Sequence, residues 1–477
     1  MRRAIVLASP FVAALALFAC EDSGSGGGTG GFTTEAGTFE AGPPSEGGAV
    51  KDGALDAPVA PKSVTVGVVR GLGPAVGATV VFHDAAGAVL ESKVTGADGR
   101  ATSSDGVAPA QASLLLGAGG NRHVITWTAV EPGDVLLARD DDNGIDPGGS
   151  FNVVTQGNFA DGGAVTLTAS VGDCTGFSPS SPIPVFVGSS CTRPTAAVLA
   201  RAFGPVGNNS VLAYAFAKGK PPVPTDAGVG SVAVGPWLGA TSVKVTPKNL
   251  PSQSSASAVL YEIADGLGIL NETGSVTRID PATTYLVAPG FADAYQAGGR
   301  MSPNSALGSV VTIARRSAPA ATNDIDFTGA PPAIDSATLD TTTIARPSAA
   351  WTTLGGASLA TMDGGAIVVS WYDQRESSGT WTFVVPPGSK SVKAPAMPNT
   401  AEPWLPHGAN DAGAAVTFQD PMVIFAEADI LPGYADFRKG IGLVIPLTDG
   451  YQPDARAILP ANGTIKLTSY RNLPTPQ

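Results

Sequence analysis

Short apolar runs separated by turn-forming residues recur along this whole chain, and this pattern most restricts the possible fold. The 477 residues include 60 Gly and 40 Pro, and Gly, Pro, Asp and Asn bound most of the runs. Alternating apolar and polar residues between such breaks are typical of strands in β-sandwiches, whereas long helical patterns are missing. We therefore predict an all-β fold made of tandem β-sandwich domains.

Composition is consistent with several folded domains. Hydrophobic residues make up 43% of the chain, which is enough to bury cores. The length suggests about two to four domains. The formal net charge is −12, and no block rich in Lys or Arg occurs. A nucleic-acid partner is therefore not expected.

The N-terminal residues have the pattern of an export signal. Arg2 and Arg3 precede the almost wholly apolar stretch 5–18, which is too short to span a bilayer comfortably. No later apolar run is long and uninterrupted enough for a transmembrane helix. We expect residues 1–19 to be a signal peptide and the protein to be exported.

The end of this segment reads Leu17-Phe18-Ala19-Cys20. It resembles the lipobox of bacterial lipoproteins, in which an aliphatic residue and then a small residue precede a Cys. The resemblance implies that Cys20 becomes the mature N-terminus and carries acyl chains that anchor the protein, with the outer membrane as the expected location. Several chains anchor stably because each buried methylene contributes about 0.8 kcal/mol. The alternative is an ordinary secretory signal in which Cys20 is incidental.

Residues 20–62 are predicted to be a disordered tether. Gly, Ser, Thr and Glu dominate this stretch, and its aromatic residues are Phe32 and Phe39. Such a composition cannot bury enough apolar surface to offset the entropy of ordering the backbone. The stretch is either a stalk that holds folded domains away from the lipid or low-complexity sequence without a selected length.

Residues 63–146 contain the most recognisable module. Val64, Val66 and Val68 mark a first strand, 73–82 read GPAVGATVVF, and 95–99 read TGADG. This succession resembles the carboxypeptidase regulatory-like, or transthyretin-like, β-sandwich. The resemblance implies a transthyretin-like or immunoglobulin-like sandwich without catalytic residues of its own. Asp98-Gly99 is a pair of the kind that reverses a hairpin.

Two further β regions follow this module, at residues 147–330 and 331–477. Clean alternation at 164–171 supports a strand in the first, and Ile367, Val369 and Trp371 share one face of a strand in the second. In the first region we predict a disulfide between Cys174 and Cys191, because an exported protein folds in an oxidising compartment. Closing this loop contributes roughly 3 kcal/mol in the chain-entropy model. Two free thiols are the alternative.

The acidic stretch 140–146 is a weak candidate for a structural Ca²⁺ site. Asp140, Asp142 and Asp146 place oxygen ligands around a Gly turn, which is the donor type that Ca²⁺ prefers. The spacing does not complete an EF-hand, because no Glu stands at the closing position. The alternative is a solvated acidic loop between two β-domains. No other cofactor is expected.

Three tryptophans in the C-terminal region are weak ligand-binding candidates. Trp371, Trp381 and Trp404 could stack on sugar rings. The alternative is that they belong to the core, because strand aromatics in sandwiches are usually buried.

Catalytic motifs are missing from the sequence. The chain has three His (His83, His123 and His407) and no G-x-S-x-G, H-E-x-x-H, P-loop or dinucleotide fingerprint. Carboxylates among apolar residues are the remaining candidates: Glu402, Glu427, Asp429 and Asp436. We therefore predict that the chain is not an enzyme.

These observations favour a non-catalytic, lipid-anchored protein of the cell envelope that acts in adhesion, recognition or scaffolding. Its partner would be an unidentified protein or glycan, and its membrane contact would be the lipid anchor. The alternative is a surface protein that binds or cleaves carbohydrate through the C-terminal aromatics.

Overall fold

The computed structural model describes most of the chain after residue 62. The described residues are 63–70, 73–117, 121–140, 150–156, 166–186, 191, 195–204, 211–220, 230–252, 254–271, 282–303, 308–372, 378–406, 416–444 and 459–471. Contacts divide the chain into Met1–Pro58 and Val59–Gln477, and all described residues belong to the second unit. The predicted signal peptide, Cys20 and the predicted tether lie outside the described residues. Among the described residues, no helix is both long and apolar enough to cross a bilayer.

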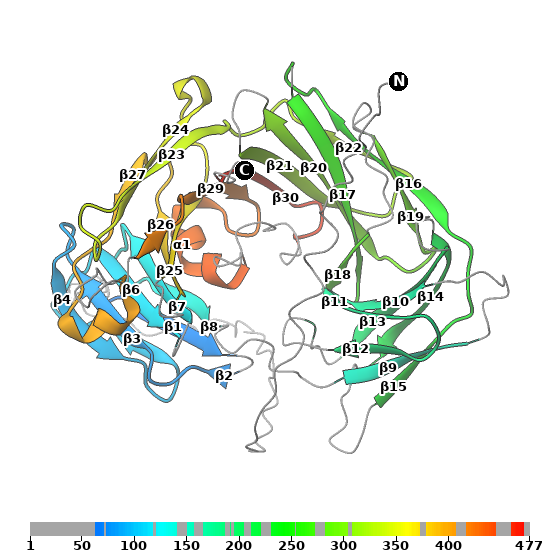
Figure 1. The fold of residues 1–477 in the computed structure, drawn as a ribbon, viewed down its shortest axis with the longest axis horizontal. Coiled ribbons are helices and arrows are strands. Elements are labelled where there is room, and N and C mark those ends of the chain that lie inside the picture. The colour runs from blue at the N-terminus through cyan, green and yellow to red at the C-terminus, as the bar shows by residue number, and fades with distance from the viewer. Residues whose placement is uncertain are drawn as a thin grey trace, which may run out of the picture. The chain divides into compact units, whose positions relative to one another are not determined.

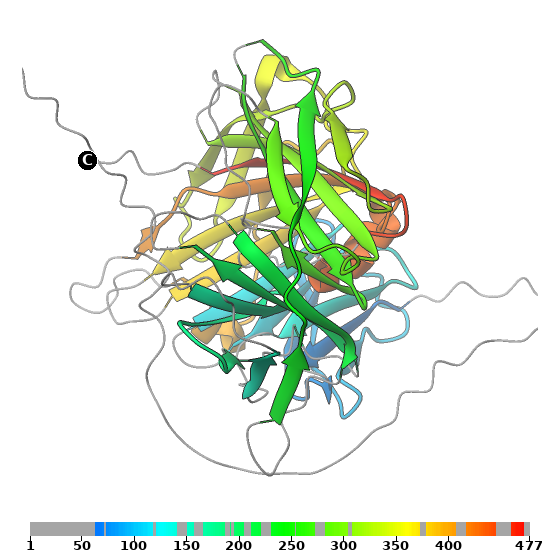
Figure 2. The ribbon, with the colours of Figure 1, turned by 90° about the vertical axis from the view of Figure 1, so that its right-hand side faces the viewer.

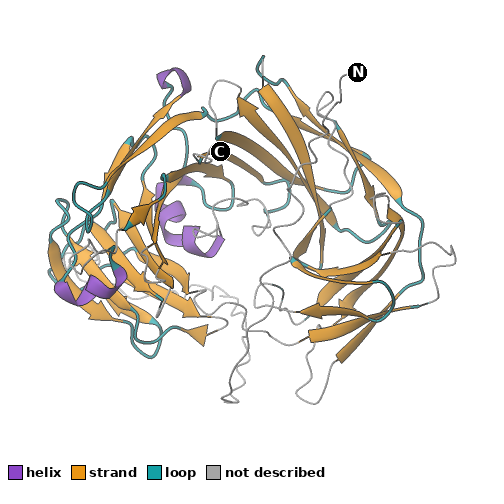
Figure 3. Cartoon of the chain, in the orientation of Figure 1, coloured by secondary structure: helices purple, strands orange, loops and turns teal. Residues whose placement is uncertain are grey.

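Strands and their connections make up almost all of the described structure, which confirms the predicted all-β class (Figure 3). The strands form several sheets that pack on one another, consistent with tandem sandwiches. The helical elements of the described residues are η1 (Leu354–Gly356), η2 (Asn399–Trp404) and α1 (Gly433–Val444). The sequence pattern does not predict α1.

The largest sheet has 13 strands and draws on all three predicted β regions (Figure 1). Its order is β18 (Leu267–Leu270), β17 (Ser254–Ala264), β20 (Ala294–Pro303), β21 (Ser309–Ser317), β30 (Thr464–Tyr470), β29 (Met422–Ala428), β25 (Gly364–Tyr372), β26 (Ser378–Val385), β7 (Asn121–Thr128), β6 (Gln111–Leu116), β3 (Thr79–His83) and β4 (Val89–Val94), with β28 (Thr417–Phe418) paired to β25.

Strand pairing in this sheet crosses both predicted boundaries. β7 of the first region runs parallel to β26 of the third, with Val124 beside Trp381. β21 of the second region runs antiparallel to β30 of the third, with Ile313 beside Lys466. The sheets therefore do not follow the segments 63–146, 147–330 and 331–477.

The middle of the large sheet is buried on both faces. On one face a sheet of β1 (Thr65–Arg70), β2 (Gly73–Pro74), β5 (Arg100–Thr102) and β8 (Val135–Asp140) packs together with α1, and we call this the β1 core. On the other face β23 (Ile334–Asp340), β24 (Ser348–Thr353) and β27 (Ser391–Lys393) enclose the β24 core. Leu114 faces the first core and its neighbour Leu115 the second. Side chains alternate across a strand, so burial on both faces explains the continuous apolar run in β6.

The second region supplies three smaller sheets. One contains β11 (Cys174–Ser178), β10 (Thr166–Val171), β13 (Ala196–Phe203) and β14 (Val211–Lys220), and it packs on β12 (Ile183–Phe186), β9 (Ser150–Thr155) and β15 (Gly230–Val234). The third contains β19 (Thr283–Val287), β16 (Thr241–Lys248) and β22 (Thr322–Asp326), and it covers β17, β20 and β21. Figure 2 shows these mostly green strands facing the viewer.

The Cys174–Cys191 disulfide is present, as predicted, with the two Cα atoms 6.0 Å apart. Cys191 is buried in the core between the sheets of β10 and β9. The segment that it closes is more than a loop, because it contains β11 and β12. The connection between these two strands, residues 179–182, consists of Pro and Ser alone.

The Asp98-Gly99 turn joins two sheets and does not form the predicted hairpin. The preceding β4 pairs with β3 in the large sheet, whereas the following β5 pairs with β1. Asp98 Oδ1 accepts a hydrogen bond from the backbone N–H of Arg100 at 3.1 Å. Gly99 has a φ of 71°, and a Cβ there would lie 2.6 Å from the carbonyl oxygen of Val68, so the crossing requires glycine.

Candidate functional site

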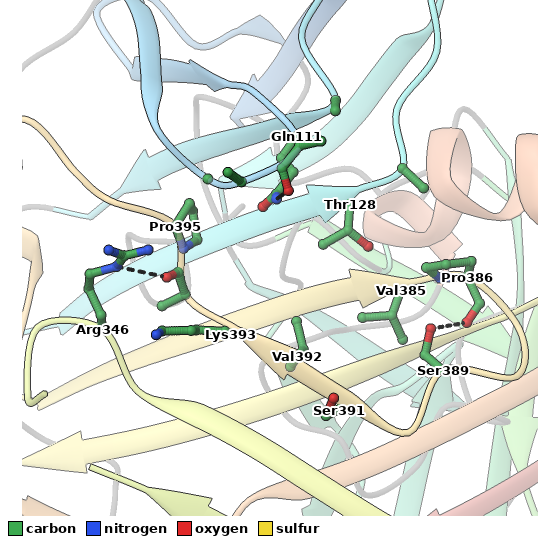
Figure 4. A pocket seen from close by; sticks show the side chains of 16 residues that line it. Gln111, Thr128, Arg346, Val385, Pro386, Ser389, Ser391, Val392, Lys393 and Pro395 are labelled. Carbon is green, nitrogen blue, oxygen red and sulfur yellow. Dashed lines mark hydrogen bonds between the residues drawn. The ribbon is translucent and has the colours of Figure 1, made fainter. Parts of the chain in front are cut away.

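One hollow of about 460 Å³ lies where the β3–β4 turn, the ends of β6 and β7, and the segment from β26 to β27 meet (Figure 4). The parallel pairing of β7 with β26 brings these distant segments together. Thr128 Oγ1 donates a hydrogen bond to the carbonyl oxygen of Val384 at 3.0 Å and ties the two strand ends. We call this the Arg346 hollow.

The Arg346 hollow has a positive end and a neutral polar end. Arg346 and Lys393 lie together at one end, and Pro386 and Ser389 lie at the other (Figure 4). Arg346 Nε donates to the carbonyl oxygen of Ala394 at 3.2 Å, and Ser389 Oγ donates to that of Pro386 at 2.8 Å. The described lining residues include no carboxylate and no aromatic side chain. This arrangement suits an anionic group with polar neighbours.

A fully buried chain of polar side chains lies beside this hollow. His83 Nε2 is 2.9 Å from Ser113 Oγ, and Ser113 Oγ is 2.8 Å from Thr126 Oγ1. Trp381 Nε1 donates to Thr126 Oγ1 at 2.9 Å. Burial lowers the pKa of His83 to about 4, with Arg346 adding to this effect and Asp84 opposing it.

The Ser113–His83 pair has the contact distance of a nucleophile and its base. Both side chains are 0% exposed, so a substrate cannot reach either of them. The pair therefore provides a hydrogen bond between buried side chains in the core, through His83 Nε2. His123 is half-buried with a pKa that burial lowers to about 4, and His407 lies outside the described residues.

Of the three tryptophans considered as a stacking platform, Trp371 and Trp381 are buried in the β24 core, which is the alternative stated from the sequence, and Trp404 packs against that core. Trp371 is 3% exposed and Trp381 0%, and the Trp381 ring stacks on that of Phe383. Trp404 is half-buried, and its Nε1 donates to the carbonyl oxygen of Gly117 at 3.1 Å. Strand aromatics are the largest apolar side chains available, so a sheet covered on both faces buries them.

The carboxylates singled out from the sequence are surface residues. Glu402, Asp429 and Asp436 are exposed, and half-buried Glu427 accepts a hydrogen bond from Lys466 Nζ at 2.9 Å. Glu427 faces outward at an alternate position of β29, and Asp429 lies in the turn that follows it. Glu402 and Asp436 stand in the helical elements η2 and α1, with buried Ala401 and Phe437 beside them.

Of the acidic stretch, the structure describes Asp140 alone. Asp140 is buried, and its Oδ2 accepts hydrogen bonds from Arg70 Nε at 2.9 Å and Arg70 Nη2 at 2.5 Å. Asp142 and Asp146 lie outside the described residues, so the Ca²⁺ site stays a prediction.

A second hollow, of about 480 Å³, has a strongly basic lining that the sequence does not mark. We call it the Arg139 hollow. Its residues come from β6, β7, β8, β25 and β26, with Gln419 and Arg471 beyond β28 and β30. Arg122 and Arg139 stand singly in unrelated strands, so no spacing in the sequence indicates that they share a site.

Comparisons with known proteins do not assign this chain to a family. No protein-family model and no curated protein matches the chain. Among solved structures, the TIE protein of Bacillus anthracis matches 50% of this chain and 44% of its own, at 13% identity and a TM-score of 0.15. The native conformation of E. coli alpha-2-macroglobulin matches 74% of this chain and 26% of its own, at 10% identity and a TM-score of 0.10. The chain thus spans less than half the length of either.

Proposed function

We propose that this chain is a non-catalytic, lipid-anchored protein of the cell envelope that acts in recognition, adhesion or scaffolding. The observation that carries the proposal is the 13-stranded sheet, which joins strands of all three β regions. Its middle is buried on both faces, by the β1 core and the β24 core. A sheet covered in this way is a rigid frame, and a rigid frame presents a binding surface at low entropic cost.

The partner is proposed to be a protein or glycan with negative charge. Arg346 and Lys393 place two cations at one end of the Arg346 hollow. Gln111, Thr128, Ser389 and Ser391 add amide and hydroxyl groups among alanine, valine and proline residues. Charge complementarity of this kind speeds encounter and selects partners. A carbohydrate-binding function, the second candidate, would rest on the same polar hollow, because the tryptophans first considered for it are in the core or half-buried.

The anchor and the location can be tested in one experiment. Intact cells that produce the full chain are treated with protease, alongside cells that produce the Cys20→Ser variant. We expect the native chain to fractionate with membranes and the variant to be released. Cleavage of the native chain on intact cells supports adhesion or recognition outside the cell. Protection until the outer membrane is opened supports scaffolding within the envelope. Membrane fractionation that is unchanged by Cys20→Ser contradicts lipid anchoring.

A further inference from the structure

The Arg139 hollow combines positive charge with a size suited to a small ligand. Its volume of about 480 Å³ falls within the common range for small-molecule sites. Arg122 stands on β7 next to Gly379 of β26, and Arg139 stands on β8. The two guanidinium groups therefore come from two different sheets, which meet at this hollow.

The positive charge in this hollow is not cancelled by its acidic residue. Three arginines line the hollow (Arg122, Arg139 and Arg471), together with one carboxylate, Asp140. Asp140 is already paired with Arg70, which lies outside the lining. Neither Arg122 nor Arg139 forms an ion pair with another described residue. A basic hollow is notable in a chain whose net charge is −12.

One N–H group of Arg139 has no hydrogen-bond acceptor within the described structure. Its Nε is buried and has no hydrogen-bond partner among the described residues. A buried N–H without an acceptor is unfavourable, and the cost is larger for a charged group. An oxyanion in the hollow would supply the acceptor and the counter-charge together.

The other lining groups indicate what else the ligand contains. Ser378 and Thr380 bring hydroxyl groups, and Tyr372 brings a side chain that is 46% exposed. His123 is neutral near pH 7, because burial lowers its pKa to about 4, so it adds a polar ring without charge. Hydroxyls beside an exposed aromatic ring suit an organic ring compound better than a bare inorganic ion.

We propose that the Arg139 hollow binds a small organic carboxylate, with Arg122 and Arg139 holding its carboxylate group. Guanidinium groups bind carboxylates through paired N–H···O hydrogen bonds, which a lysine cannot reproduce. The β7–β26 and β1–β8 pairings fix the backbone positions of the two arginines before the ligand arrives. This site is independent of the lipid anchor and of the Arg346 hollow.

Calorimetric titration of the full-length chain in detergent at low salt tests the proposal. The probes are glucuronate, glucose as its uncharged counterpart, and inorganic phosphate. We expect saturable binding of glucuronate and none of glucose. Arg122→Gln and Arg139→Gln should each weaken binding about tenfold or more, because each removes a charged hydrogen-bonding partner. Arg139→Lys should restore the charge but only part of the affinity.

Arg315→Gln is the matched control, because Arg315 is exposed on β21 of the same large sheet. It should bind glucuronate like the unchanged chain. Thermal unfolding without ligand identifies any variant that fails to fold, and Arg139→Lys then replaces Arg139→Gln. Binding of phosphate alone would overturn the organic carboxylate in favour of an inorganic oxyanion. Equal binding in all variants, or no binding of either anion, would overturn the site. Neither result bears on the protease experiment.

Discussion

The indole ring of Trp371 lies directly against the backbone of Gly379. The two residues are paired across β25 and β26, and an ideal Cβ on Gly379 would lie 2.2 Å from Trp371 Cζ2. This close approach lets the ring enter the β24 core, where it is 3% exposed. The same two residues line the Arg139 hollow, so packing of this pair also shapes that site.

Gly379→Ala should destabilise the protein by about 1–3 kcal/mol, because the added methyl group overpacks a site with no room. Gly268→Ala is the control, since Gly268 also lies in a strand and its Cβ would meet its nearest neighbour at an ordinary 4.0 Å. Urea unfolding measures both variants. Equal stability of the two variants would contradict the packing argument.

Acid should destabilise the protein through His83. Its pKa is about 4 when folded and 6.5 when unfolded, so below pH 6.5 the unfolded state binds the proton more readily. The stabilising contribution is complete above pH 6.5 and is lost as the pH falls towards 4, at about 1.4 kcal/mol per pH unit. Unfolding free energies at pH 7.0, 6.0 and 5.0 should fall by more than this slope, because the pKa of His123 is also lowered to about 4 by burial. His83→Asn should reduce the slope, and an unchanged slope in that variant would assign the effect to other groups.

Removal of the disulfide should lower stability by roughly 3 kcal/mol, because the unfolded chain gains the entropy of an open loop. The change is Cys174→Ser together with Cys191→Ser, and thermal unfolding is the measurement. Thiol labelling of the unchanged chain should modify these two residues only after reduction. Labelling before reduction, or a melting temperature unaffected by the double substitution, would contradict a structural disulfide.

The buried ion pair between Arg438 and Asp134 should hold α1 against β8. Arg438 Nε is 2.7 Å from Asp134 Oδ2, and both side chains are buried. Arg438→Met should cost about 3 kcal/mol, because it leaves Asp134 charged and buried with only Lys439 Nζ, 3.6 Å away, as a counter-charge. Adding Asp134→Asn should recover part of that loss. Lys466→Met, which breaks the more exposed pair with Glu427, should cost less than about 1 kcal/mol. Similar losses of unfolding free energy in Arg438→Met and Lys466→Met would show that burial of the ion pair does not determine its contribution to stability.

Helix α1 is an element that the sequence pattern does not predict. It contains Gly440 within its span and begins at Gly433, so its intrinsic helix propensity is weak. Phe437 is buried in the β1 core, and Tyr434 Oη donates to the carbonyl oxygen of Thr128 at 2.6 Å. Contacts with distant strands therefore stabilise a helix that local sequence does not favour.

The sequence by itself determined the all-β class, the strand positions around Val66 and Val369, and the disulfide. Each depends on residue type and on alternation along a single strand, which are local properties. Only the tertiary structure decided that β7 pairs with β26, that Trp371 and Trp381 are buried, and that Arg122 and Arg139 share a hollow. Which strand a given strand pairs with depends on how both faces of the sheet pack. That packing involves residues more than 200 positions apart, and alternation along one strand does not identify them.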